Sequence, residues 1–333
     1  MGTAWRALRR RILTPSTSET LLDVRGFHKK SPEAQKNLET VGASFLEGYA
    51  HAAEAADPED AVTPLNEIEP YYRGFAYEGA GMGFAVRDGL PLGPTDLTAR
   101  FLAGEGDKHV YMVYVGIGWA MARIPKFRWP KADTMDPLLR WLVLDGYGFH
   151  QAYFKTKRYI DEQFVDPRFS WPGGEYSKTP AGGTSYANRA LDQGIGRAMW
   201  FIGGSDGALV AKMINKFPEH RREDLFAGTG LAATYAGGAD ESELRAYLDL
   251  VGEYQPVVRQ ASAFASEARV RAGLVIPHTE IASRVFCGLS PQDAAQVTHD
   301  ARRGLPADGE LPAYEVWRQR VAGQFASLGG VSR

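Results

Sequence analysis

Four ionisable side chains lie within two residues of a Gly-x-Gly step, in otherwise apolar parts of the sequence: Glu78, Asp145, His150 and Arg197. Burying such groups is costly unless they are paired or neutralised. They therefore form either a structural ion-pair cluster, in which Arg73 or Arg197 neutralises Glu78 or Asp145, or a set of acid–base groups whose pKa values are tuned by burial. Both interpretations are open, and we treat the four residues as candidate catalytic residues.

The sequence gives little support to other kinds of catalytic centre. His150, His278 and Glu280 are metal-ligand types, but no HxxxH, HExxH or HxD spacing accompanies them. DDxxD and DxDD motifs are missing, and so is the GxSxG motif of nucleophile-elbow hydrolases. The single cysteine, Cys287, excludes an intramolecular disulfide and is interpreted as a small buried hydrophobe. We expect neither a metal nor another cofactor.

The candidate residues belong to five similar segments. Each has a Gly-x-Gly core followed by small and aromatic residues, and the cores begin at positions 79, 116, 146, 194 and 228. Spacings of 30 to 48 residues are typical of stacked helical hairpins. A glycine inside a helix costs roughly 1 kcal/mol relative to alanine, so ten of them need compensation. The compensation is either close helix packing or a ligand against exposed backbone.

A phosphate-binding loop does not explain the glycines, because such a loop needs a preceding strand, Glu78 and Asp145 would repel an anion, and a single cofactor cannot explain a pattern that occurs five times. Aromatic residues are dense around them, and most must belong to the core. A groove beside the glycine backbone would be flat, apolar and long, suited to an elongated unsaturated chain. The candidate substrate-binding residues are Gly79, Gly81, Trp119, Tyr147, Phe149, Trp200 and Tyr235.

Helix signals recur along the chain. Helix starts are predicted at Ser31-Pro32, Asp136-Pro137 and Ser290-Pro291, and at a capping box of Asp240 with Glu243. Helix ends with left-handed glycines are predicted at Gly89, Gly203-Gly204 and Gly237-Gly238. The stretch 109–115 (HVYMVYV) also fits a strand and is the least certain. We predict an all-α fold of repeated α-hairpins packed through Gly-x-Gly helices, either solenoid-like or an α/α bundle.

The predicted organisation is a basic N-terminal segment (1–30), a first helical half (31–164), an irregular loop (165–184) and a second helical half (185–330), together forming one compact domain. With 38 basic and 40 acidic residues the net charge is −2, so no nucleic-acid partner is expected. The N-terminal segment lacks a secretory signal, and no apolar run spans a bilayer. The expected location is the cytoplasm. The segment is either a solvated terminus or a basic amphipathic surface for a membrane or partner, formed by Trp5, Arg6, Leu8, Arg9, Arg10, Arg11, Ile12 and Leu13.

Several motifs together resemble a family of bacterial enediyne biosynthesis proteins, the UnbL type, catalogued as a domain of unknown function. They are YYRGFAYEGAGMGFAV, WLVLDGYGFHQAYF, LDQGIGRAMWFIGG, PHTEIASRVFCG and PAYEVWR, and the resemblance runs from about Leu8 to Phe325. It implies a pathway rather than a reaction: a cassette that turns a linear polyene from an iterative polyketide synthase into an enediyne core. Its implied partners are the polyene and other cassette proteins (UnbV and the membrane protein UnbU).

The first functional hypothesis is an enzyme of enediyne core maturation that binds the polyene between glycine-rich helices. Two alternatives stay open: a noncatalytic helical-repeat scaffold or carrier, and a cofactorless cyclase of another apolar chain. An enclosed pocket with unpaired carboxylates or a shifted histidine favours an enzyme, whereas a smooth apolar face with every charge paired favours a scaffold.

Overall fold

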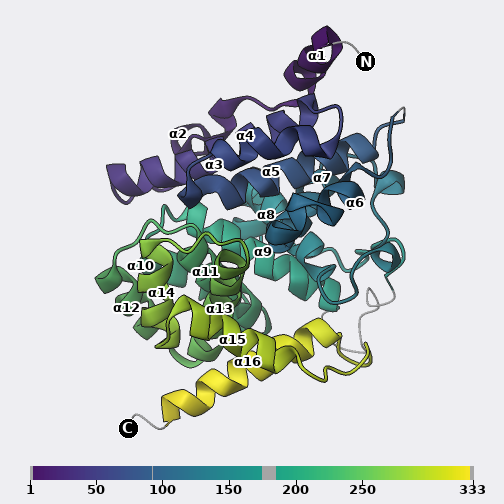
Figure 1. The fold of residues 1–333 in the computed structure, drawn as a ribbon. Coiled ribbons are helices and arrows are strands. Elements are labelled where there is room, and N and C mark those ends of the chain that lie inside the picture. Colours follow the sequence, from purple (N-terminus) through teal and green to yellow (C-terminus); the bar gives the residue numbers. More distant parts are fainter. Residues whose placement is uncertain (1–2, 92, 175–184, 331–333) are drawn as a thin grey trace.

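The computed structural model describes residues 3–91, 93–174 and 185–330, and within these ranges it contains helices and no strand (Figure 1). The all-α prediction is confirmed. The strand-like stretch 109–115 forms the end of a 3₁₀ turn (Glu105–His109) and the start of α7. The irregular stretch predicted for 165–184 has no helix up to residue 174, and residues 175–184 lie outside the described residues.

Seven helices form a row in which each helix packs against the next one along the chain. Five of them carry the Gly-x-Gly pairs, and the first and last flank these five. The row consists of α3 (Pro32–Glu54), α5 (Pro70–Asp88), α7 (Val110–Met121), α8 (Trp141–Phe154), α9 (Tyr186–Ile202), α11 (Glu219–Tyr235) and α13 (Gln255–Arg271).

The two glycines of each pair face opposite neighbours. Gly116 of α7 packs on the carbonyl of Glu78 in the preceding helix, and Gly118 packs on the carbonyl of Val143 in the following helix. The other four pairs repeat this arrangement, and a Cβ at any of the ten glycines would lie 2.9 Å or less from a neighbouring carbonyl oxygen. The glycines therefore let successive backbones touch, which confirms the close-packing interpretation and offsets the low helix propensity of glycine.

The row curves until its later helices reach its first ones. Asn37 Nδ2 on α3 donates to the carbonyl of Ala236 beyond α11 (2.8 Å), and Arg269 on α13 donates to the carbonyl of Tyr71 on α5 (3.0 Å). The Tyr235 side chain of α11 lies against Gly74 of α5. The helices thus enclose a common interior, rather than running on as an open solenoid.

The other helices pack around the row. At one end of the molecule lies α1 (Thr3–Leu13), and α16 (Ala313–Gly330) crosses the other end (Figure 1). The remaining helices are α2 (Leu22–Arg25), α4 (Val62–Glu67), α6 (Leu97–Ala103), α10 (Gly207–Ile214), α12 (Glu241–Leu250), α14 (Pro277–Cys287) and α15 (Pro291–Arg302).

Most of the predicted helix starts are correct. Ser31 and Ser290 each accept a backbone N–H in the first turn of the following helix, and Asp240 forms the predicted capping box. The start at Asp136 is wrong, because its carboxylate accepts two backbone N–H groups of a turn and α8 begins only at Trp141.

The helices α5, α9 and α11 end at or next to the predicted glycines, but the predicted left-handed conformation is found only at some of them. Gly204, Gly237 and Gly238 have positive φ angles, as predicted. Gly89 and Gly203 instead continue with right-handed backbone (φ −80° and −81°), so the left-handed prediction is wrong there.

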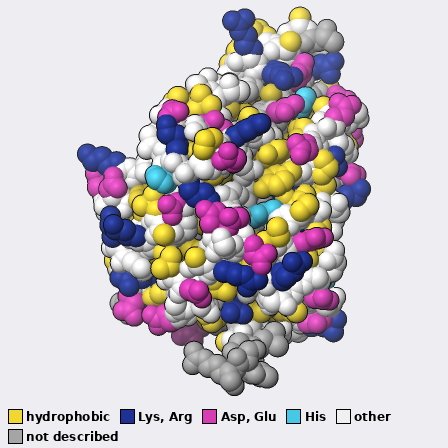
Figure 2. Space-filling model, turned by 90° about the vertical axis from the view of Figure 1, so that its left-hand side faces the viewer, with side chains coloured by type: hydrophobic (Ala, Val, Ile, Leu, Met, Phe, Trp, Pro, Cys, Tyr) yellow, Lys and Arg dark blue, Asp and Glu magenta, His cyan; other side chains and the backbone are white. Residues whose placement is uncertain are grey.

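The surface carries charges of both signs, interspersed on the face that Figure 2 displays, as the near-zero net charge requires. None of the helices in the described part of the chain combines the length and apolar character needed to cross a bilayer.

Candidate functional site

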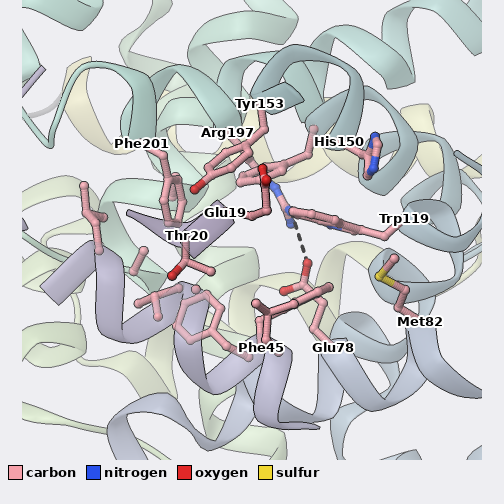
Figure 3. A pocket seen from close by; sticks show the side chains of 18 of the residues that line it. Glu19, Thr20, Phe45, Glu78, Met82, Trp119, His150, Tyr153, Arg197 and Phe201 are labelled. Atoms are coloured by element: carbon pink, nitrogen blue, oxygen red, sulfur yellow. Dashed lines mark ion pairs between the residues drawn. The ribbon is translucent and has the colours of Figure 1, made fainter. Parts of the chain in front are cut away.

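A cavity lies inside the curved row of helices. Its volume is about 90 Å³, and its walls, which are mainly apolar, come from α3, α5, α7, α8, α9 and α11. A 3₁₀ turn (Thr17–Thr20) that follows α1 contributes Glu19 and Thr20 to the wall (Figure 3). The volume exceeds the space that one water molecule needs several times over, so a small ligand has room.

One position of the repeat supplies the wall in every glycine helix. The residue directly after the second glycine lines the cavity in all five cases: Met82, Trp119, Phe149, Arg197 and Leu231. Four of these side chains are apolar. Arg197 is the exception in this register, and it places a guanidinium group in an apolar wall.

Arg197 meets two carboxylates that come from different helices. Its Nη2 atom lies 3.8 Å from Glu78 Oε1, and its Nε atom lies 3.2 Å from Asp145 Oδ1. All three side chains are at least nine-tenths buried. Neither Arg197 Nε nor Asp145 Oδ1 has an aligned hydrogen-bond partner among the described residues. Of the two arginines considered from sequence, Arg197 forms the pairs, whereas Arg73 donates to the carbonyl of Ile68. We call Glu78, Asp145 and Arg197 the cavity cluster.

Burial dominates the electrostatics of the cavity cluster. Desolvation raises the pKa of Glu78 to about 7, against the opposing effect of Arg197 and with a further contribution from Asp145. Desolvation also raises the pKa of Asp145, again opposed by Arg197. A carboxyl group that titrates near neutral pH can both give and accept a proton, which is what general acid–base catalysis needs.

His150 also lines the cavity, but it plays a different electrostatic part. Burial lowers its pKa to about 3, so the imidazole is neutral at physiological pH. Its ring lies edge-on to Trp119 and close to Phe154, and its Nδ1 atom has no hydrogen-bond partner among the described residues. A neutral imidazole of this kind can exchange a hydrogen bond with a ligand but is a poor source of positive charge.

The predicted substrate-binding residues divide into three groups. Trp119, Phe149 and Tyr235 line the cavity. Gly79 and Gly81 face the backbones of α3 and α7, so the structure assigns them to helix packing and any contact with ligand stays a prediction.

The third group lies outside this cavity. Tyr147 packs against Trp129 and Phe169 beside a separate surface pocket. Trp200 is fully buried and donates from Nε1 to the carbonyl of Gly237 (2.8 Å).

The other candidate metal-ligating and nucleophilic side chains have separate surroundings. His278 Nε2 hydrogen bonds with the carbonyl of Ala233 (2.8 Å), and Glu280 is exposed. No group of three metal-ligating side chains occurs among residues 3–91, 93–174 and 185–330. Burial raises the pKa of the Cys287 thiol to about 12, so this buried cysteine is a weak nucleophile.

Sequence reasoning missed several cavity residues. Phe45, Met82, Tyr153 and Phe201 line the cavity and surround the cavity cluster (Figure 3). Met82 could have been identified as the residue directly after a second glycine. Tyr153 and Phe201 lie one helical turn after Phe149 and Arg197, so the same pattern could have identified them. Phe45 has no such signal, because α3 lacks a Gly-x-Gly pair.

The arrangement combines a mainly apolar cavity with one carboxyl group whose pKa is raised by burial to about 7. It can therefore hold an apolar molecule and exchange a proton with it. The sequence matches no curated protein and no protein of solved structure. The family comparison matches residues 4–325, and the chain accordingly belongs to the DUF1702 family, described as proteins of unknown function.

Proposed function

We propose that the protein is an enzyme that binds a slender, unsaturated apolar molecule in the cavity and transfers a proton to or from it through Glu78. One observation carries this proposal: a mainly apolar cavity holds a buried carboxyl group whose pKa is raised by burial to about 7. Structural ion pairs are normally well hydrogen bonded, but the cavity cluster is not. Poorly satisfied buried polar groups with shifted pKa values are typical of functional sites.

The substrate class comes from the resemblance to enediyne biosynthesis proteins, which implies a linear conjugated polyene. A polyene is uncharged and slender, so it suits this cavity. In the proposed reaction the Glu78 carboxyl protonates one carbon of the polyene, and a carboxylate of the cavity cluster removes a proton from another carbon. The molecular formula does not change, so the step is an isomerisation or ring closure that needs no oxidant. The protein would then act in enediyne core maturation, in the cytoplasm.

A carrier is the second candidate function. Arg197 lies within 4 Å of both carboxylates, so its positive charge compensates much of their negative charge. The cavity cluster can therefore be structural and take no part in a reaction. A carrier would bind the same polyene and release it unchanged.

The test mixes purified protein with an uncharged linear conjugated polyene and follows the absorbance spectrum, chromatographic retention and mass of the polyene. Glu78→Gln is the matched control, because it keeps the shape of the side chain and removes the titrating proton. The proposal predicts binding by both proteins and conversion by the wild type alone. Equal conversion by both would remove Glu78 from the mechanism, binding without conversion would favour the carrier, and no binding would contradict both functions.

We also propose that the exposed face of α1 lies on an anionic membrane surface. Trp5, Leu8 and Ile12 lie on one face of α1 and are 50%, 46% and 66% exposed, and the helix contains four arginines and no acidic residue. Arg9 fixes α1 to the end of α3 through the carbonyls of Ala53 (2.5 Å) and Ala55 (2.6 Å). The cavity wall follows directly after α1 in the chain, so an apolar substrate dissolved in lipid would be delivered close to it.

Sedimentation with vesicles tests this surface. Vesicles that contain phosphatidylglycerol should bind the wild type, and the double variant Trp5→Ser/Ile12→Ser should bind them at least about tenfold more weakly. Equal binding of the two proteins, or no binding of the wild type, would contradict the proposal.

A further inference from the structure

A second, smaller cavity adjoins the first one. Its volume is about 40 Å³, and residues of α7, α8, α9, α11, α13 and α16 line it. Four side chains, those of Met112, Arg197, Leu231 and Tyr235, belong to the walls of both cavities. The two spaces therefore share a wall of side chains, with Arg197 at their junction, and we call them the first and second chambers.

The second chamber is mainly apolar, and its charged side chains are Arg197 at the junction and Glu267. Glu267 of α13 is 4% exposed, and its Oε1 atom accepts a hydrogen bond from the Tyr111 hydroxyl (3.2 Å). Its other oxygen, Oε2, lies 2.9 Å from His299 Nε2 but has no aligned hydrogen-bond donor among the described residues. The chamber thus has a buried acceptor with spare capacity in its wall.

A second unsatisfied group belongs to Tyr235, whose side chain lines both chambers and whose hydroxyl lies against Gly74 of α5. The hydroxyl of Tyr235 is fully buried and has no hydrogen-bond partner in the described part of the chain. The great majority of buried polar atoms in proteins are hydrogen bonded, and an unsatisfied one costs about 1–3 kcal/mol. The unsatisfied oxygen of Glu267, together with the wall that the two chambers share, indicates a path that a partly polar ligand completes.

We infer that the binding path continues from the first chamber past Arg197 and Tyr235 into the second chamber, and that its ligand is an elongated apolar molecule with a hydroxyl group at its leading end. The hydroxyl donates a hydrogen bond to Glu267 Oε2, while the carbon chain extends back toward Glu78. Met112, with its unbranched and adaptable side chain, moves aside at the junction. This inference rests on the proposed function, because it extends the same cavity and specifies the end group of the substrate.

Filling the second chamber tests the path. Ala268 lines only the second chamber and Ala232 lines only the first one, and both are buried. The probe is trans-parinaryl alcohol, a fluorescent conjugated tetraene with a terminal hydroxyl, titrated against the full-length protein. Ala268→Leu fills part of the second chamber and should weaken binding by about tenfold or more. Ala232→Leu is the matched control, because the same substitution fills part of the first chamber instead.

The polar end is tested by changing the charge of Glu267. The wild type should prefer the alcohol over trans-parinaric acid, because the carboxylate of the acid is repelled by Glu267 and only the alcohol can donate to it. Glu267→Gln should reduce this preference by about tenfold. Thermal melting checks that each variant folds, and the preference of Glu267→Gln decides the matter if Ala268→Leu does not fold.

The outcomes separate the inference from the proposed function. Weaker binding by Ala268→Leu and loss of the preference in Glu267→Gln support the longer path. Binding of both probes at wild-type strength by both folded variants would overturn it and leave the first chamber as the whole site. No binding of either probe by the wild type would overturn the proposed function and this inference together.

Discussion

Two buried charge clusters of this molecule differ in how completely their hydrogen bonds are made. The cavity cluster joins α5, α8 and α9 at distances of 3.2 and 3.8 Å, with unaligned atoms. The second cluster joins α9, α11 and α16, and we call it the network cluster. It consists of Arg189, Asp224, Glu315 and Arg318.

The network cluster is saturated. Arg318 donates to Asp224 Oδ1 (2.9 Å) and to Glu315 Oε2 (2.6 Å), and Arg189 donates to both acidic residues as well. Burial opposes ionisation of Asp224, but Arg318 and Arg189 outweigh it and lower the pKa of this carboxyl group. These side chains therefore hold three helices together, and nothing is left over for a ligand.

The contrast shows what burial alone does not tell. Both clusters are at least nine-tenths buried on their acidic side chains, yet burial raises the carboxyl pKa values in one and the arginines lower the Asp224 pKa in the other. The two clusters differ in geometry. Aligned hydrogen bonds offset the free-energy cost of removing the charged groups from water, whereas loose contacts do not. The looser cluster borders the mainly apolar cavity inside the row of helices, whereas Glu315 and Arg318 of the network cluster border a separate and more polar pocket.

The largest expected effect is on stability. Asp224→Ala leaves Arg189 and Arg318 without one of their carboxylates in a buried site, so the free energy of unfolding should fall by about 3–5 kcal/mol. Asp145→Ala should cost less than half as much, because Arg197 keeps Glu78 and its pair with Asp145 is poorly aligned. Urea denaturation measures both values. Equal losses would show that the two clusters do not differ as we describe.

The next effect is on turnover. Glu78→Gln removes the titrating proton, so conversion of the polyene should fall by about 100-fold or more, which corresponds to about 2.7 kcal/mol of barrier. At pH 5, where the Glu78 carboxyl group is protonated in the folded protein, the free energy of unfolding should change by less than about 1 kcal/mol, because the substitution then removes no charge. Rates and denaturation midpoints from the same preparation test the two statements together. A large loss of stability with unchanged turnover would make the cavity cluster a structural device.

The third effect is a pH dependence. The pKa of Glu78 rises from 4.5 in the unfolded chain to about 7 in the folded protein, so the folded state binds the proton more tightly. This contribution to stability is present below about pH 4.5 and is lost as the pH rises through about 7. Between pH 5 and 7.5 the wild type should lose on the order of 2 kcal/mol more stability than Glu78→Gln. Parallel stability curves for the two proteins would place the Glu78 pKa near its ordinary value.

The smallest effect compares two buried tyrosines. Tyr186 donates its hydroxyl to Glu315 Oε2 (3.0 Å) in the network cluster, whereas the Tyr235 hydroxyl beside the cavity cluster has no hydrogen-bond partner among the described residues. Tyr186→Phe should therefore cost about 1 kcal/mol, and Tyr235→Phe should cost nothing or stabilise the protein slightly. Thermal denaturation of the two variants distinguishes them. The reverse order would contradict the hydrogen-bond assignments of both regions.

Much of the fold follows from local signals in the sequence. The glycine pairs predicted close helix packing correctly, because a missing side chain at a fixed spacing records a backbone contact. Ser31 and Asp240 marked their helices correctly, but Asp136 caps only a turn, since a carboxylate can satisfy the amides of a turn as well as those of a helix.

The site was harder to predict. Glu78, His150 and Arg197 line the first chamber, as the glycine neighbourhood suggested, and Asp145 meets Arg197. Tyr147 lies elsewhere, because the residue between two glycines faces away from this interior. The wall from α3 and the second chamber depend on how the row of helices curves, and no local pattern encodes that curvature.

The protonation state of Glu78 tests the central claim most directly. Infrared difference spectra of wild type minus Glu78→Gln would isolate the C=O stretch of the protonated Glu78 carboxyl group across a pH titration, with and without bound trans-parinaryl alcohol. We predict a band that titrates near pH 7 in the free protein and shifts when the alcohol binds. A band that disappears near pH 4.5, or that does not respond to the alcohol, would contradict a proton-transferring site in this cavity.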